Sequence, residues 1–402
     1  MKVDPGFGRQ LMEQEERYGI PDPRGLEQVF LRADGVYLWD LQGNRFMDFL
    51  GGDGAVSQGH NHTRIAASMV EQCLRLSLVT QGVRHARLPP YLEKLCTLTG
   101  FGAALPMNTG AEAVEVAIKA ARRWAYRVKG VAPGRAEILV FTGNAHGQTT
   151  TLAGLSGDPD AADDFGPFGA GFRMAAFGDA VAAAEAVGPA TCAILVEPIQ
   201  GRAGLRIPPR GFLRSLRELC DRRGLLLLAD EVQCGLGRTG KLFAFEHEGI
   251  RPDGAILGKA LSGGFYPASA FLASREIMDL LTPGSHRSTF AGNPLACAVA
   301  SAALDVLAEE HLVDRSAELG AYFLARLRSM ECPRVREARG LGLWAALELR
   351  EPAARAACEA LAREGLLAQA LGDSILALTP PLIITREQLD WSLERLERVL
   401  AH

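Results

Sequence analysis

The sequence predicts an α/β fold built on a mostly parallel β-sheet that is flanked by helices. Two short apolar runs without polar alternation, Leu225–Ala229 and Gly254–Gly258, are typical of strands buried on both faces of a parallel sheet. Stretches with helical periodicity, such as Gly211–Arg223, lie between the apolar runs. With 402 residues, of which 48% are hydrophobic, the chain can bury a large core and form more than one domain.

Further apolar runs predict the other elements along the chain. Val36–Asp40 and Arg45–Phe49 predict a hairpin that turns at Gly43-Asn44. Two more buried strands are expected at Glu137–Phe141 and Cys192–Val196. The C-terminal part has mainly helical periodicity, which indicates a second, α+β domain. Its expected elements are a helix at 295–310, strands near 342–349 and 375–378, and an amphipathic helix at 386–402.

Each of the two central runs ends on an ionisable residue. Asp230 follows the first run and Lys259 follows the second. Ligands of an open parallel sheet bind beyond the carboxyl ends of its strands, so both side chains are expected at one edge. Pyridoxal phosphate (PLP) requires an amine that forms a Schiff base and an acid beside its pyridinium nitrogen. A buried Asp–Lys ion pair that closes two strands explains the same spacing equally well.

The start of the helix after Asn108 is a candidate phosphate site. Thr109, Gly110 and Ala111 form a turn directly before a segment with strong helical periodicity. Backbone N–H groups at a helix N-terminus bind phosphate readily. The alternative is that Thr109 serves only as an ordinary N-cap.

Two other motifs are not expected to bind a cofactor or metal. Gly235–Gly240 matches the pattern GxGxxG, but Glu231–Cys234 separates it from the preceding strand and no capped helix follows. A turn-rich loop is therefore expected, not a dinucleotide site. His60 and His62 lack a third ligand at a suitable spacing, so no metal site is expected there.

Composition excludes several classes of function. The net charge is −4 and the basic residues are scattered, so nucleic acid is not an expected partner. No apolar run is long enough to span a bilayer, and residues 1–5 begin no hydrophobic signal segment, so no membrane partner is expected. The eight cysteines form no CxxC pair, as is usual for reduced thiols of a cytoplasmic protein.

Four ordered motifs resemble those of the class-III PLP-dependent aminotransferases, and in particular the ornithine aminotransferases. They are Asn108–Ala113, Glu197–Gly201, Asp230–Gly240 and Gly258–Leu261, and the resemblance extends from about Leu26 to the C-terminus. It implies a fold-type I PLP-dependent transferase that acts as a homodimer with shared active sites. The implied parts are an N-terminal segment at 1–55 that joins the small domain, a large PLP-binding domain at 56–290 and a small α+β domain at 291–402.

The resemblance also implies a role for each matching residue. Lys259 would bind PLP as a Schiff base and move the substrate's α-proton, while Asp230 would keep the pyridine nitrogen protonated. The other residues implied to hold the cofactor are Gln233 at the ring hydroxyl, Val232 on a ring face, His146 and Glu197 near the ring, and Thr109, Gly110 and Ala111 at the phosphate, with Thr289 of the partner subunit.

The expected substrate-binding positions depart from the family's pattern. Ala145 stands where the family has an aromatic residue that stacks on the ring. Arg202 stands where a glutamate is usual, and Ala377 replaces the arginine that pairs with this glutamate and grips a substrate carboxylate. Asp53 replaces a usual tyrosine, and a usual aromatic pair falls near 83–84. The cofactor residues therefore match the family, whereas the substrate residues have changed.

We expect Arg202, with Arg84, to receive an anionic part of a small amino substrate, and Asp53 to meet a cationic or hydroxylated part. Three functions stay open. They are transamination of a substrate other than ornithine in its usual pose, another PLP reaction (racemisation, elimination, replacement or carbon–carbon bond formation) in a biosynthetic pathway, and PLP binding without catalysis. Neutral sequence drift in a working aminotransferase, with neighbouring residues compensating for the lost contacts, also explains the departures. Both members of the Glu–Arg pair changed together, however, which indicates a coordinated change.

Overall fold

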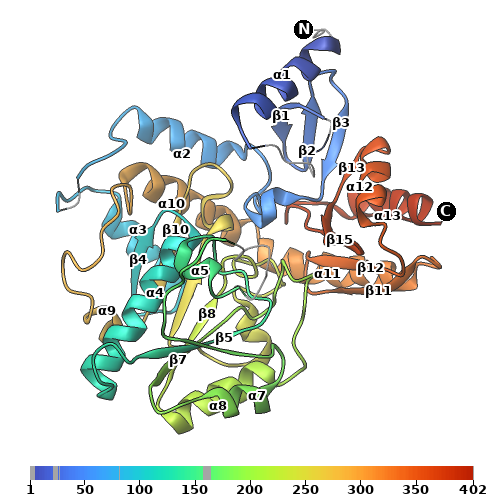
Figure 1. Cartoon of the computed structure of the whole chain (residues 1–402). Helices are drawn as coiled ribbons and strands as arrows, with labels where there is room; N and C mark the ends of the chain where they lie inside the picture. Colours follow the sequence, from blue (N-terminus) through green and yellow to red (C-terminus); the bar gives the residue numbers. More distant parts are fainter. Residues whose placement is uncertain (1–4, 21–25, 27, 81, 157–163, 402) are drawn as a thin grey trace.

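A seven-stranded sheet lies at the centre of the larger lobe (Figure 1). The computed structural model describes residues 5–20, 26, 28–80, 82–156 and 164–401. The strands of this sheet are β4 (Ala103–Met107), β5 (Glu137–Phe141), β6 (Phe172–Ala175), β7 (Thr191–Val196), β8 (Leu226–Asp230), β9 (Gly254–Leu257) and β10 (Ser269–Ala273). Their order is β4-β10-β9-β8-β7-β5-β6. All neighbouring pairs are parallel except those of β10, which is antiparallel to both β4 and β9. The predicted mostly parallel α/β sheet is confirmed.

Both faces of this sheet are buried because alternate residues of each strand pack on different helices. In β7, Ala193 and Leu195 join a cluster with helix α4 (Gly110–Trp124), which continues into a π-helical turn, η2 (Ala125–Lys129). Ile194 and Val196 join the cluster that contains α8 (Phe212–Arg223) and α10 (Pro294–Glu309). This double burial explains the uninterrupted apolar runs, since each buried aliphatic side chain stabilises the fold by about 1.5–3 kcal/mol.

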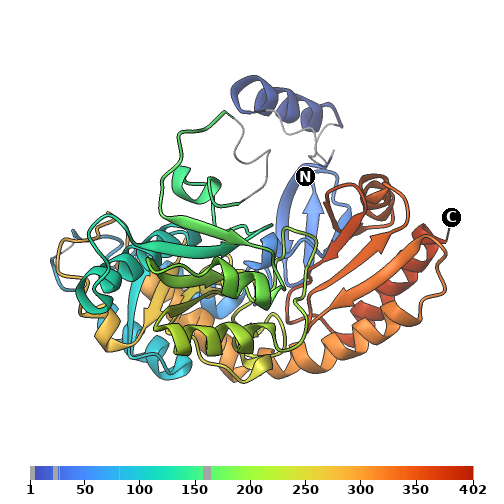
Figure 2. The same cartoon turned by 60° about the horizontal axis from the view of Figure 1, so that its bottom comes forward.

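Two smaller sheets combine the two ends of the chain. The first has the order β1-β2-β3-β13, from β1 (Phe30–Asp34), β2 (Tyr37–Asp40), β3 (Arg45–Asp48) and β13 (Leu366–Leu367). The second has the order β11-β12-β15-β14, from β11 (Val335–Gly340), β12 (Ala345–Leu349), β14 (Gln369–Leu371) and β15 (Ile375–Leu378). The β2–β3 hairpin is confirmed. Because β13 pairs in parallel with β3, the N-terminal and C-terminal ribbons lie side by side in both views (Figures 1 and 2).

The remaining described helices cover the sheets and the periphery. They are α1 (Pro5–Tyr18), α2 (Thr63–Cys73), α3 (Leu88–Thr99), α5 (Thr150–Ala153), α7 (Ala180–Ala186), α9 (Arg275–Met278), α11 (Leu312–Ser329), α12 (Ala354–Arg363) and α13 (Arg386–Leu400), with short turns η1 (Gly51–Gly54), η3 (Ala244–Glu248) and η4 (Lys259–Ser262). Helix α1 lies at the edge of the molecule (Figure 2). Within the described ranges, no helix combines the length and apolarity that crossing a bilayer requires.

The predicted C-terminal elements are present with small shifts in their bounds. Helix α10 corresponds to the run at 295–310, and α13 to the final helix, whose last predicted residue, His402, lies outside the described residues. Residues 235–240 form successive turns and no helix, as expected for this loop. The domain boundaries near residues 55 and 290 stay a prediction.

Candidate active site

Five strands deliver polar residues to one edge of the large sheet. Because β4, β5, β7, β8 and β9 run in the same direction, the residues that end or follow them meet at their carboxyl ends. These residues are Thr109, His146, Glu197, Asp230 and Lys259. The strand-end argument from sequence is confirmed, and this edge is where an open α/β sheet binds ligands.

Asp230 is the centre of a buried hydrogen-bond network. Its Oδ2 lies 2.7 Å from Nδ1 of His146, and its Oδ1 accepts the backbone N–H of Val232 at 3.1 Å. Both members of the Asp230–His146 pair are buried. Glu197, also buried, accepts the backbone N–H of Ala145 at 2.9 Å. Buried groups held in this way cannot change position without leaving a polar atom unpaired.

Burial and the neighbouring charges shift the pKa values of the groups in this network. Burial raises the pKa of Glu197 to about 7, and the carboxylate of Asp230 adds to the rise, while His146 and Lys259 oppose it. Burial by itself lowers the pKa of His146, but the hydrogen bond and charge of Asp230, with the charge of Glu197, raise it above the usual value.

Lys259 begins η4 in a left-handed backbone conformation, with φ of +44°. Its side chain is half-buried. Burial, and then the charge of Arg202, lower the pKa of Lys259 from its usual value. Three acids act in the opposite direction, and they are, in descending order, Asp53, Asp230 and Glu197. Easier deprotonation makes an amine a better nucleophile, and backbone strain of this kind is frequent at functional sites.

The N-terminus of α4 is held by a capping box. The Oγ1 of Thr109 accepts the backbone N–H of Glu112 at 3.2 Å, and the carboxylate of Glu112 accepts the backbone N–H of Thr109 at 3.1 Å. Thr109 is thus an N-cap, and its hydroxyl hydrogen remains able to donate, so the phosphate role stays a prediction. A Cβ at Gly110 would lie 3.0 Å from Val232, so the helix start and the loop after β8 approach closely.

A tight loop presents Arg202 to the site. Gln200 and Arg206 close this loop with two backbone hydrogen bonds of 3.1 and 2.8 Å. A Cβ at Gly201 would lie 2.3 Å from Oε1 of Gln233 and 2.5 Å from the ring of Trp344, so only glycine fits there. The guanidinium of Arg202 is exposed, and its charge acts on Lys259.

Asp53 also lies within electrostatic range of Lys259, in a different part of the chain. It belongs to η1, and its Oδ1 accepts a hydrogen bond from Nε2 of Gln369 at 3.3 Å. Gln369 pairs in register with Ala377, the position where the resemblance implies an arginine, and Ala377 is buried. No motif around Gln369 predicts a place at the site, because only the strand register brings it there.

Among the described residues, neither Arg84 nor Thr289 forms a hydrogen bond or salt bridge with Lys259. Both are exposed, in segments that lie against each other: Nε2 of His85 is 2.8 Å from the carbonyl oxygen of Gly292. Ser288 is anchored at the start of α4, where its hydroxyl donates to Glu112 at 2.8 Å. The expected role of Thr289 across a subunit interface stays a prediction, as does that of Arg84.

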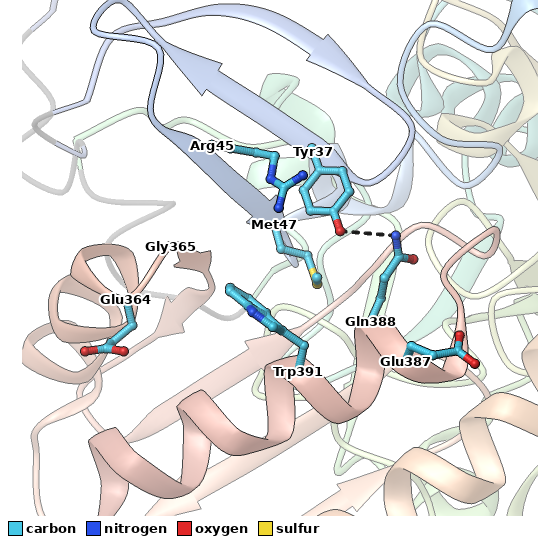
Figure 3. Close-up of a pocket in the computed structure, with 8 residues that line it drawn as sticks. All are labelled: Tyr37, Arg45, Met47, Glu364, Gly365, Glu387, Gln388 and Trp391. Atoms are coloured by element: carbon cyan, nitrogen blue, oxygen red, sulfur yellow. Dashed lines mark hydrogen bonds between the residues drawn. The ribbon is translucent and has the colours of Figure 1, made fainter.

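A cavity of about 290 Å³ lies away from this edge, between the N-terminal hairpin and α13 (Figure 3). It is lined by Tyr37, Arg45, Met47, Glu364, Gly365, Glu387, Gln388 and Trp391. Across it, Nε2 of Gln388 donates to the hydroxyl oxygen of Tyr37 at 3.3 Å. None of the residues predicted to bind PLP or substrate lines this cavity, so it is separate from the candidate active site.

The model of the family described as Aminotransferase class-III matches residues 23–400. The chain belongs to this family. An ornithine aminotransferase of Bordetella pertussis is 51% identical over 390 residues, which are 96% of this chain and 95% of that protein. The structure of the ornithine aminotransferase from Toxoplasma gondii is 37% identical, with a TM-score of 0.95, covering 98% of this chain and 94% of that one. An acetylornithine aminotransferase from Elizabethkingia anophelis is 41% identical, with a TM-score of 0.89 and 98% coverage of both chains.

As a class-III aminotransferase, the chain is a PLP-dependent transferase. The residues at the sheet edge fit this cofactor. A half-buried amine with a lowered pKa faces a buried carboxylate, and Nε2 of His146 is buried without a hydrogen-bond partner among the described residues. The first turn of α4 adds backbone N–H groups that have no partner within the helix, which suits a phosphate.

Proposed function

We propose that this class-III aminotransferase takes its amino group from a small substrate that places an anionic group on Arg202, unlike ornithine in its usual pose. One observation carries the proposal: the charge of Arg202 acts on Lys259, at a position where the resemblance implies an acid, and Ala377 is a buried alanine where it implies an arginine that grips a carboxylate. Among the residues that the structure describes, Arg202 forms no salt bridge, so its charge is available to a ligand. A guanidinium binds a carboxylate or phosphate bidentately.

The roles of the chain's own residues follow from their positions. PLP, when bound, supplies an electron sink for bond breaking at the carbon that bears the reacting amine. Lys259 would hold the cofactor and then use its Nζ to remove and return a proton. Asp230 would pair with the pyridine nitrogen and Gln233 with the ring hydroxyl, while Val232 would pack on the ring. The start of α4, with Thr109, would bind the phosphate.

We also propose a homodimer in which each subunit contributes to the other's site. Arg84 and Thr289 support it, because both are exposed in neighbouring segments of the single chain, where a partner subunit can reach them. Sedimentation of the PLP-loaded protein tests this proposal. We expect a stable dimer, and a fully PLP-loaded monomer would contradict it.

The substrate proposal is tested with ornithine and 2-oxoglutarate. PLP-loaded enzyme is mixed with both, and the cofactor spectrum and glutamate release are followed for wild type and for Arg202→Ala. We expect weak turnover of ornithine, and loss of turnover of better amino substrates in Arg202→Ala. Arg206→Ala, in the same loop, is the matched control. Rapid ornithine turnover that Arg202→Ala leaves unchanged would restore the drift explanation.

One observation favours a second candidate function, a PLP reaction other than transamination. Ala145 leaves space where the family has a ring-stacking aromatic side chain, and a larger or second substrate can use this space. The same experiment separates the two functions. Consumption of an amino substrate without conversion of 2-oxoglutarate to glutamate would favour the second.

A further inference from the structure

We infer that Arg339 is a positioning residue for the proposed substrate site, because it holds the loop at 200–206 that presents Arg202. The inference rests on the proposed function and specifies it further, since it names the group that fixes the backbone beneath the anion-binding guanidinium. Arg339 does not contact the substrate in this role. It acts on the backbone of the loop and leaves the side chain of Arg202 free to meet an anionic group.

The guanidinium of Arg339 joins this loop to the second small sheet. From β11, its Nε donates to the carbonyl oxygens of Gly204 and Leu205 at 3.0 and 3.2 Å, and its Nη2 donates to Gly204 at 2.7 Å. Its Nη1 donates to the carboxylate of Glu348 on β12 at 2.6 Å. Each of the three guanidinium nitrogens therefore has an acceptor, and the planar fork fixes their relative directions. Only 15% of the Arg339 side chain is exposed, so water competes little for these bonds.

The loop is strained at the two residues that Arg339 contacts. Gly204 and Leu205 have φ values of +94° and +54°, so both adopt the left-handed conformation. Glycine adopts it readily, whereas a bulky residue such as Leu205 does so at a cost in energy. The side chain of Leu205 is buried in an apolar cluster with Trp344 and Ala346. The hydrogen bonds from Arg339 therefore oppose relaxation of the backbone at the strained position.

Arg202 belongs to the same turn as these two residues. The backbone N–H groups of Gly204 and Leu205 both donate to the carbonyl oxygen of Gly201, at 3.1 and 2.9 Å. The turn therefore closes around Arg202, and the residues that Arg339 holds set the position of its backbone. The Arg202 side chain is exposed and has no salt bridge within the described part of the chain. A fixed backbone that carries a free guanidinium reduces the ordering cost of binding an anion.

A simpler role for Arg339 is to stabilise the contact between the two sheets, without any effect on substrate binding. A double-mutant cycle separates the two roles. The PLP-loaded enzyme is given alanine, aspartate, 4-aminobutanoate and ornithine, with 2-oxoglutarate as amino acceptor, and the amine with the highest kcat/KM is used throughout. Arg339→Gln should raise KM for this amine by roughly tenfold with little change in kcat, since it removes charge-assisted hydrogen bonds. In the Arg202→Ala background, the same substitution should raise KM by less than about twofold.

Arg336→Gln is the matched control. Arg336 lies on the same strand and pairs with the same carboxylate, with its Nη1 3.0 Å from Oε1 of Glu348, but among the described residues it has no hydrogen bond to the loop. Arg336→Gln should therefore leave KM at the wild-type value. Arg339→Lys keeps the charge but loses the planar fork, so its KM should lie between those of wild type and Arg339→Gln. An equal rise of KM in Arg336→Gln and Arg339→Gln would overturn the inference, as would equal effects of Arg339→Gln with and without Arg202.

Hydrogen exchange of the PLP-free protein separates failure of this inference from failure of the proposed function. The backbone amides at 204–206 are hydrogen-bonded within the loop, and they should exchange faster in Arg339→Gln than in wild type or Arg336→Gln. Unchanged protection in Arg339→Gln would overturn the inference. If thermal denaturation shows that Arg339→Gln does not fold, Arg339→Lys takes its place in every measurement. Absence of turnover with all four amines, or a silent Arg202→Ala, would instead overturn the proposed function.

Discussion

Two sides of Lys259, the proposed cofactor side and the proposed substrate side, are built differently. On the cofactor side, Asp230, His146 and Glu197 are buried, and hydrogen bonds connect them to one another or to the backbone. On the substrate side, Asp53 is half-buried and Arg202 is exposed, and few contacts restrain either. Replacing one member of a buried polar network leaves its partners without hydrogen bonds. Replacing an exposed or singly bonded residue reduces the stability of the fold much less. If the proposed roles hold, the residues of the reaction chemistry are constrained by the fold, while those of substrate choice can vary.

The largest expected effect lies at Lys259 itself, where the two sides meet. Lys259→Ala should leave no detectable transamination, because the proposed covalent and proton-transfer roles belong to the same amine. Borohydride reduction and peptide mapping should label Lys259 in the wild type. Lys241→Ala, an exposed lysine outside the site, is the control and should remain active. Label on another lysine would contradict the assignment.

On the cofactor side, Asp230→Asn should slow α-proton exchange by roughly 10²–10⁴-fold while PLP stays bound. The variant removes the carboxylate that is proposed to keep the pyridine nitrogen protonated, and it also alters the group that lies 2.7 Å from Nδ1 of His146. Isotope exchange followed by NMR measures the rate. Asp221→Asn, on the surface of α8, should exchange at the wild-type rate. A near-normal rate in Asp230→Asn would show that the role is misassigned.

On the substrate side, Arg202→Ala should raise KM for the true amino substrate by roughly 10–100-fold, the loss expected for a charge-assisted contact. PLP affinity and thermal stability should not change, because the guanidinium is exposed. Steady-state kinetics and calorimetry measure the three quantities. A variant that loses PLP or unfolds early would mean that the two sides are not independent.

The smallest expected effect is the pH dependence of stability on the cofactor side. Burial raises the pKa of Glu197 to about 7, so the folded state favours its neutral form. The corresponding stability is present below the ordinary carboxyl pKa and is lost as pH rises through about 7. The thermal midpoint of PLP-free protein should therefore fall by a few degrees between about pH 5 and 8.

Glu197→Gln should make this fall shallower, and Glu185→Gln, on the surface of α7, should not. Some slope should remain in Glu197→Gln, because burial also raises the pKa of Glu231 to about 7. An identical slope in Glu197→Gln and wild type would show that Glu197 is already ionised in the folded protein at low pH.

Local sequence patterns were enough to locate the elements of the proposed cofactor side. Uninterrupted apolar runs marked β8 and β9, and Asp230 and Lys259 followed where those runs ended. Helical periodicity and Thr109 located the start of α4, where the structure adds a capping box with Glu112. These features depend on burial and hydrogen bonding within a few residues, which the order of side chains records directly.

Tertiary structure alone decided the substrate side and the strand order. The contact between Asp53 and Gln369 joins residues 316 positions apart, and it exists because β13 pairs with β3. Likewise, nothing in the apolar residues of β10 shows that this strand is antiparallel and lies between β9 and β4. An apolar run reports that a strand is buried, but every buried strand offers the same backbone groups to a partner. The choice among partners is made by the packing of the whole chain.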